Sequence, residues 1–137
     1  MADPVFIQDG GLGVKLTTLR DNLLSNLQLR LYRVDRVPAA GDVVTDYVEC
    51  TFSGYSSQTF SDLGAVSVSG GAAQVSTGVH TFSHSGGPTA NSVYGWFAVD
   101  SQNRLICASR NGAGPVTLAA AGQSYSVQVT FTDQRAP

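Results

Sequence analysis

Hydrophobic and polar residues alternate with a period of two in several segments of the chain, and one segment has a helical period instead. Leu27, Leu29 and Leu31 alternate with Gln28 and Arg30, which predicts a half-buried strand. Near the end of the sequence, residues 125–132 alternate between large apolar side chains and Ser, Gln or Thr in the same way. Both segments therefore predict strands with one face on a core.

Further short apolar runs are separated by turns rich in Gly, Pro, Asn and Asp, which indicates many short strands. The run Val93–Asp100 is apolar on both faces, so we expect a strand that is central in a sheet or lies in an interface. The predicted fold is mostly β, an antiparallel β-sandwich of the jelly-roll or Greek-key kind. The other expected strands cover residues 46–52, 79–84, 104–110 and 116–118.

One short helix is expected near the N-terminus, over residues 18–26. Thr18 followed by Asp21 resembles a capping box at its start, and Asn26 is a suitable stop. The leucines of this region follow the 3-4-7 spacing of one helical face; they are Leu16, Leu19, Leu23, Leu24 and Leu27. We therefore divide the chain into an N-terminal arm, residues 1–13, and a single sandwich domain, residues 14–137.

The arm contains the apolar triplet Val5, Phe6 and Ile7, followed by a glycine-rich stretch, residues 10–13. That stretch matches neither a phosphate-binding loop nor a dinucleotide fingerprint, so we interpret it as a flexible hinge. Because exposed apolar residues promote association, the triplet is a candidate contact with a neighbouring subunit.

Composition narrows the function classes further. The chain has 137 residues with a formal net charge of -2, and only 13% of its residues are charged although 42% are hydrophobic. Scattered basic residues argue against nucleic-acid binding, and no apolar run is long enough for a membrane helix. We find no secretory signal.

Cys50 and Cys107 lie in apolar, strand-like contexts, so we expect reduced, buried thiols, with a cross-strand disulfide as the alternative.

No pattern of catalytic, cofactor-binding or metal-ligating residues is present, and we expect a protein that is not an enzyme. His80 and His84 are four residues apart, which on a strand is about 13 Å and too far for one ion. We expect both to face solvent. The acidic residues fall mostly in turns and show no calcium-loop spacing.

Three aromatic residues are candidates for binding. Tyr55, Tyr94 and Trp96 could stack on sugar rings, but packing in the core or in a subunit interface is the commoner role. Tyr94 and Trp96, with the apolar triplet of the arm, are therefore our candidate partner-contact residues.

Five stretches together resemble a family of small bacteriophage structural proteins, over roughly residues 16–132. The end of the chain, Val127–Thr132 (VQVTFT), is similar to the end of the family's shared pattern. The chain departs from the family pattern at Arg33, Cys50 and Ser109. The stretches are Leu29–Val34 (LRLYRV), Pro38–Asp42 (PAAGD), Tyr47–Tyr55 (YVECTFSGY), Val93–Asp100 (VYGWFAVD) and Leu105–Arg110 (LICASR).

The resemblance implies a virion component, a head decoration or cement protein that binds the major capsid protein and stabilises the assembled shell. We expect it to form a homotrimer, because closed three-fold symmetry suits an icosahedral lattice. The alternative is a tail or spike adhesion module that binds host-surface glycan through Tyr55, Trp96 or nearby loops. A baseplate or neck subunit would share the fold and differ only in its location.

Overall fold

The computed structural model describes residues 9–134, and the predicted class is confirmed: antiparallel β-sheets with one short α-helix. The helix is α1 (Asp9–Asn22), and two single turns of 3-10 helix follow, η1 (Leu24–Asn26) and η2 (Val44–Asp46). The strands are β1 (Gln28–Tyr32), β2 (Gln58–Thr59), β3 (Ser67–Ser69), β4 (Ala72–Ser76), β5 (His80–Ser83), β6 (Asn91–Val93), β7 (Gly95–Val99), β8 (Leu105–Arg110), β9 (Val116–Leu118), β10 (Ser124–Val127) and β11 (Thr130–Gln134).

The described strands form four small antiparallel sheets. Their orders are β2-β1-β7-β8, β11-β4-β3, β10-β5 and β6-β9. The predicted strand over residues 125–132 is two strands, β10 and β11, which pair with β5 and β4 on either side of a break. At that break Thr77 takes the place of regular strand pairing by forming two hydrogen bonds with Val129. Its backbone N–H donates to the Val129 carbonyl, and its hydroxyl accepts a hydrogen bond from the Val129 N–H.

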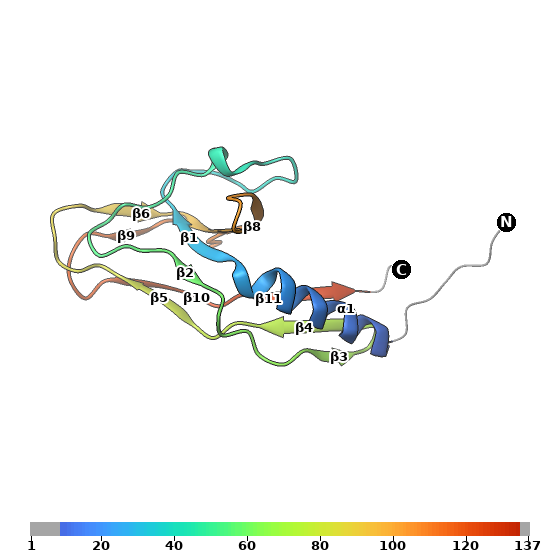
Figure 1. Ribbon diagram of the computed structural model, residues 1–137. Coiled ribbons are helices and arrows are strands. Elements are labelled where there is room, and N and C mark those ends of the chain that lie inside the picture. Colours follow the sequence, from blue (N-terminus) through green and yellow to red (C-terminus); the bar gives the residue numbers. More distant parts are fainter. Residues whose placement is uncertain (1–8, 135–137) are drawn as a thin grey trace.

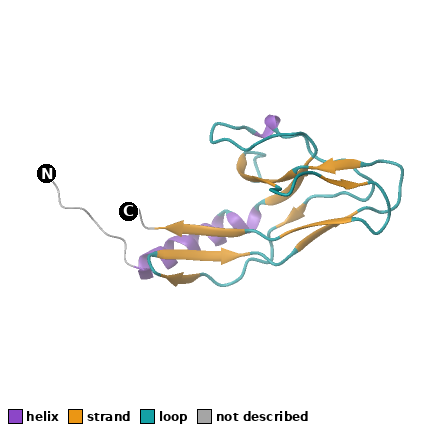
Figure 2. Cartoon of the chain, turned by 180° about the vertical axis from the view of Figure 1, so that it is seen from behind, coloured by secondary structure: helices purple, strands orange, loops and turns teal. Residues whose placement is uncertain are grey.

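Both views show an elongated molecule with α1, β3, β4 and β11 at one end and β5, β6, β9 and β10 toward the other (Figures 1 and 2). In Figure 1, β1, β6 and β9 lie above β5, β10 and β4, and the chain crosses between these two levels several times. This arrangement is compatible with the predicted sandwich. The loop between β1 and β2, which carries η2, projects from the upper level.

The helix is longer than predicted and begins earlier. It starts at Asp9 rather than near Thr18, so the glycine-rich stretch predicted to be a hinge is helical. Tertiary packing outweighs the low helix propensity of glycine here. Leu12 and Leu16 are each 1% exposed and join the core, and α1 packs on the sheet formed by β3, β4 and β11. Of the predicted leucine stripe, Leu19 is exposed.

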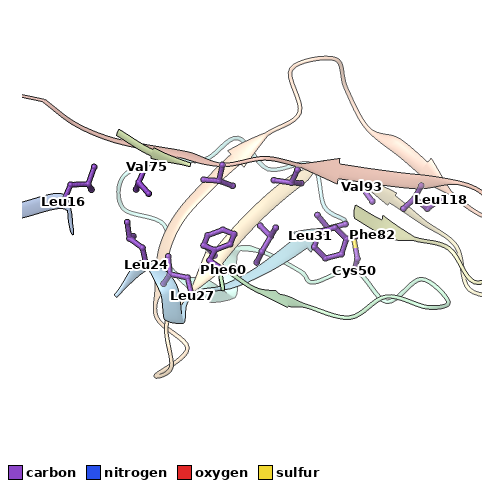
Figure 3. Close-up of a cluster of buried hydrophobic side chains, with 14 of the residues drawn as sticks. Leu16, Leu24, Leu27, Leu31, Cys50, Phe60, Val75, Phe82, Val93 and Leu118 are labelled. Atoms are coloured by element: carbon purple, nitrogen blue, oxygen red, sulfur yellow. The ribbon is translucent and has the colours of Figure 1, made fainter. Parts of the chain in front are cut away.

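The main core runs the length of the molecule between the two levels. Figure 3 shows its side chains from Leu16 at the helix to Val93 and Leu118 at the far end. Leu29 and Leu31 point inward from β1, as their alternation predicts, and are fully buried. A second, smaller cluster lies beneath the loop that follows β1; it contains Tyr32, Tyr47, Phe97 and Val99.

The segment 93–100, predicted as one strand, is divided at Tyr94. β6 leaves to pair with β9, whereas β7 pairs with β1 and β8. β7 is therefore an interior strand of its sheet. Both of its faces are apolar because Trp96 and Ala98 pack on the main core, whereas Phe97 and Val99 belong to a second cluster on the other face. The predicted turn after β7 is present, and Asp100 closes it by accepting the backbone N–H groups of Gln102 and Arg104.

Candidate functional site

A groove lies between the loop after β1 and the strand β8. β8 is the last strand of its four-stranded sheet, and its outer edge pairs with no strand in residues 9–134. The groove has a volume of about 330 Å³, and an adjoining hollow shares Asp42 and Leu105 with it. Most of its lining residues are apolar in type, but polar atoms are exposed along its walls as well; the lining includes Pro38, Ala39, Ala40, Tyr47, Ile106 and Ala108.

One buried carboxylate fixes the loop wall of the groove. The side chain of Asp42 is 4% exposed, and it forms an ion pair with Arg36. Asp42 also accepts hydrogen bonds from the Tyr47 hydroxyl at 2.7 Å and from the Ala39 backbone N–H at 3.0 Å. The Arg36 guanidinium and then the Tyr47 hydroxyl hold the pKa of this carboxyl well below its usual range. Asp42 thereby ties three points of the loop together.

Tyr47 anchors that wall to the sheet. Its ring stacks on Phe97 at 5.4 Å between centroids and meets the edge of Tyr32 at 5.0 Å. Burial, and then the hydrogen bond to Asp42, raise the pKa of the Tyr47 hydroxyl. Such aromatic contacts add to the free energy of area burial, so the loop is held rigidly against β1 and β7.

Apolar side chains remain exposed around the groove. Val37 is 70% exposed, Val43 56% and Ile106 38%. Arg104, at the start of the strand edge, pairs with Asp100 at 2.6 Å. A rigid wall, an unpaired strand edge and exposed apolar side chains are what an added extended polypeptide segment requires. The arrangement has the features that such a segment would need.

The predicted partner-contact residues lie elsewhere. Tyr94 is half-buried in the second cluster, with the Arg110 guanidinium 5.4 Å from its ring centroid, and Trp96 packs against the main core. The structure thus gives both rings partners within the chain, and their contact with another subunit stays a prediction. Val5, Phe6 and Ile7 lie outside the described residues.

Tyr55 is likewise engaged within the chain. Its hydroxyl donates to the Glu49 carboxylate at 2.6 Å and accepts the Leu31 backbone N–H at 3.1 Å. Its ring stacks on Phe82 at 5.9 Å and meets Phe52 at 5.3 Å. Burial and the bond to Glu49 raise the pKa of this hydroxyl.

The prediction that both histidines face solvent is wrong, because His80 is 8% exposed and His84 is 3% exposed. His80 bonds Gln58 through Nδ1 at 2.8 Å and Asp62 through Nε2 at 2.9 Å. The Gln58 amide nitrogen donates to the Thr81 carbonyl, so its oxygen faces the ring. His80 therefore joins β5 by hydrogen bonds to β2 and to the segment that follows β2.

His84 lies in a different environment, but like His80 it joins neighbouring segments of the chain by hydrogen bonds. Its ring lies nearly parallel to Phe52 at 6.1 Å and bonds the Thr89 carbonyl at 2.8 Å, while its Nδ1 accepts the Gly86 N–H. The alternation of polar and apolar residues missed both burials because hydrogen-bonded partners offset the cost of desolvating a ring. In the described chain, no three His, Cys, Asp or Glu side chains gather as a metal site.

Both cysteines are free thiols in the structure. Cys50 is buried, as predicted, whereas Cys107 is only partly buried, at the groove. Burial raises the pKa of Cys50 to about 12 and that of Cys107 to about 11. Protonated thiols are poor nucleophiles, so neither is suited to covalent chemistry near neutral pH.

Sequence reasoning missed the groove. In sequence, Pro38–Asp42 stands out only as one of the stretches that resemble phage structural proteins, and residues 104–110 only as an expected strand. A usable signal was present in the apolar residues that lie next to turn residues in the loop, Val37 and Val43, since turns usually carry polar side chains. That the loop lies beside β8 follows from tertiary packing, which no local pattern shows.

Comparisons of the chain with protein-family models, curated proteins and solved structures found no match. No helix within residues 9–134 has the length and apolar character needed to cross a membrane.

Proposed function

We propose that this chain is a non-enzymatic structural protein of a bacteriophage particle, a head decoration or cement protein that binds the major capsid protein and forms a homotrimer. The groove beside β8 is the structural observation that supports this proposal most directly. The resemblance of five sequence stretches to small phage structural proteins supplies the identity of the partner.

The groove suits protein binding because its parts are already in place. Asp42 and Tyr47 hold the loop wall, and β7 holds the other wall by pairing with β8 from Arg110 to Leu105, with an irregularity in the register at Ile106. Preorganised walls lower the entropy cost of binding. An extended segment of the capsid protein would add to the free edge of β8 and cover Ile106 and Val43.

The outer face of the sheet at the helix end is also consistent with contacts between subunits. Apart from Ala72, the described side chains on the face opposite the helix are polar and uncharged; they are Ser67, Ser69, Gln74, Ser76, Thr130 and Thr132. Such a face packs against a neighbour without the desolvation cost of buried charges. This matches the low charged fraction of the whole chain.

The test is incorporation into particles of the phage that encodes the chain. Ile106→Asp places a charge on the groove edge, and Val79→Asp places one at a position that is 63% exposed on the segment before β5. We expect at least tenfold fewer copies per particle for Ile106→Asp and normal incorporation for Val79→Asp. Equal incorporation of the two folded variants would contradict the role of the groove.

Glycan adhesion, the alternative function, makes a different prediction. It requires an aromatic ring with a free face and measurable affinity for a host saccharide. The described rings of Tyr55 and Trp96 pack within the chain, so the structure offers it less support than it offers a protein contact. Saturable binding of host-surface glycans to the purified chain would favour the alternative.

A further inference from the structure

A second apolar groove lies at the other end of the molecule, between α1 and β3. It has a volume of about 350 Å³ and is lined by Val14, Thr17 and Thr18 from the helix and by Val66 and Val68 from the strand side. Val14 is 68% exposed and Val68 is 36% exposed. Two valines this exposed beside each other form an apolar surface that packing within residues 9–134 leaves uncovered.

The groove adjoins an unpaired strand edge. β3 pairs with β4 through Ser67–Ser69, and its other edge pairs with no strand in the described part of the chain. The contact between helix and strand is close, because a Cβ built on Gly13 would lie 3.0 Å from a methyl carbon of Val68. The floor of the groove is thus fixed, and an extended segment could both pair with β3 and cover the valines.

The chain itself contains a segment of matching length and chemistry. Val5, Phe6 and Ile7 are three consecutive residues of high β-propensity, and β3 is three residues long. The segment joins the chain at Asp9, at the same end of α1 as Gly13 and Val14. Only Gln8 separates the apolar triplet from α1, and the half of α1 nearest to it in sequence borders this groove.

Chain geometry favours the groove of another copy over the segment's own. To run back along its own helix, the segment would have to reverse direction with only Gln8 between Ile7 and Asp9. Connections between elements take about two to six residues, so the turn would use part of the triplet itself. Val14 and Thr18 lie about 7.5 and 13.5 Å along the helix from Asp9, at 1.5 Å per residue. A neighbouring copy can present its groove without that turn.

We propose that the Val5–Phe6–Ile7 segment of one copy adds as a strand to the free edge of β3 in another copy. Because side chains alternate along a strand, Phe6 then lies against Val14, Val66 and Val68, while Val5 and Ile7 lie on the opposite face of the sheet. Repeated around a closed ring, this exchange gives each copy one donated and one accepted segment. The proposal deepens the oligomeric part of the proposed function. It is tested on the purified chain without capsid, so its failure leaves the location in the particle as a separate question.

The first experiment is photo-crosslinking. The chain is prepared with p-benzoyl-phenylalanine at position 6, as ¹⁴N and ¹⁵N material, and the two are unfolded, mixed, refolded and irradiated. We expect crosslinks from position 6 to residues 13–18 or 66–68, in peptide pairs that combine both isotopes. Crosslinks confined to one isotope, crosslinks to other regions, or their absence would overturn the proposal.

The second experiment compares two valines of nearly equal exposure. Val14 is 68% exposed in the groove and Val79 is 63% exposed on the segment before β5, outside both grooves. We expect Val14→Asp to raise the dissociation constant of the oligomer at least tenfold in light scattering, and Val79→Asp to leave it unchanged. Equal effects of the two folded variants, or a monomeric parent chain at micromolar concentration, would contradict the exchange.

Discussion

The hydroxyl of Tyr47 donates a hydrogen bond to the buried carboxylate of Asp42 at 2.7 Å, and this pair joins the loop after β1 to the aromatic cluster on the sheet. Arg36 binds the same carboxylate from the other side. A loop that sequence alone marks only as a turn region is therefore a rigid wall beside β8.

Tyr47→Phe keeps the ring stacked on Phe97 but removes the hydroxyl. We expect a loss of about 1 kcal/mol in the free energy of unfolding, the usual net contribution of one hydrogen bond. Urea unfolding followed by tryptophan fluorescence measures it. Tyr94→Phe is the matched control, because the Tyr94 hydroxyl makes no hydrogen bond to any residue within 9–134, and it should unfold at nearly the parental urea concentration.

Stability should fall in acid because two carboxyls have lowered pKa values. Arg36 and Tyr47 lower the pKa of Asp42, and the Arg104 backbone N–H is the largest cause of the lowered pKa of Asp100. In the unfolded chain these groups take up protons near pH 3.9. The unfolded state then binds more protons than the folded state, so the stabilisation is fully present above about pH 5 and is lost as pH falls further.

Asp42→Asn should therefore lower the free energy of unfolding at neutral pH. It should also make that free energy fall less steeply between pH 5 and 3 than it does in the parent. Asp21→Asn is the control, because the Asp21 side chain is 60% exposed and pairs only with its neighbour Arg20 among the described residues. Thermal unfolding across this pH range measures both. A decline for Asp42→Asn as steep as that of the parent would show that Asp42 does not carry the effect.

The two thiols should react slowly in the folded chain. With pKa values of about 12 and 11, Cys50 and Cys107 are almost entirely protonated at pH 8. We expect modification by a thiol reagent to be about a hundredfold slower than in denaturant, and slower for the buried Cys50 than for Cys107. Mass spectrometry of Cys50→Ser and Cys107→Ser assigns the rates. A disulfide in the unreduced protein, or folded-state rates equal to those in denaturant, would contradict this.

Gly95 should not tolerate a side chain, because a Cβ there would collide with the Ser109 carbonyl oxygen and lie 2.8 Å from the Tyr32 ring. We expect Gly95→Ala to cost about 1–3 kcal/mol, as overpacking of a core does. Gly41→Ala is the matched control, since nothing lies within 4 Å of a Cβ built on Gly41. Equal urea midpoints for the two variants would contradict this prediction, because they would show that β7 and β8 can move apart with no loss in the free energy of unfolding.

The sequence predicted the class of the fold because alternation reports local burial well. Leu29 and Leu31 are buried as their spacing indicates, and the turn at Asp100 is where its residues place it. The start of α1 could not be predicted, because its glycines are held helical by packing of Leu12 and Leu16 on strands far along the chain. The burial of His80 depends on Gln58 and Asp62, which are also distant in sequence.

The candidate site was predictable only in part. The apolar triplet before α1 lies outside the described residues, so its contact stays a prediction, and the two surfaces suited to receive protein segments were not predicted. Ile106 and Val68 resemble ordinary strand residues in sequence, and only the sheet order shows that each lies on a free edge. Tyr94 and Trp96 stood out as large aromatics, yet the structure gives them neighbours within the chain.

The most direct test of the proposed function is the number of copies of this chain per phage particle, measured by quantitative mass spectrometry against the major capsid protein. A head decoration protein predicts a copy number comparable with that of the capsid protein, and immunogold label spread over the head. A few copies confined to the tail or neck, or none in purified particles, would contradict it.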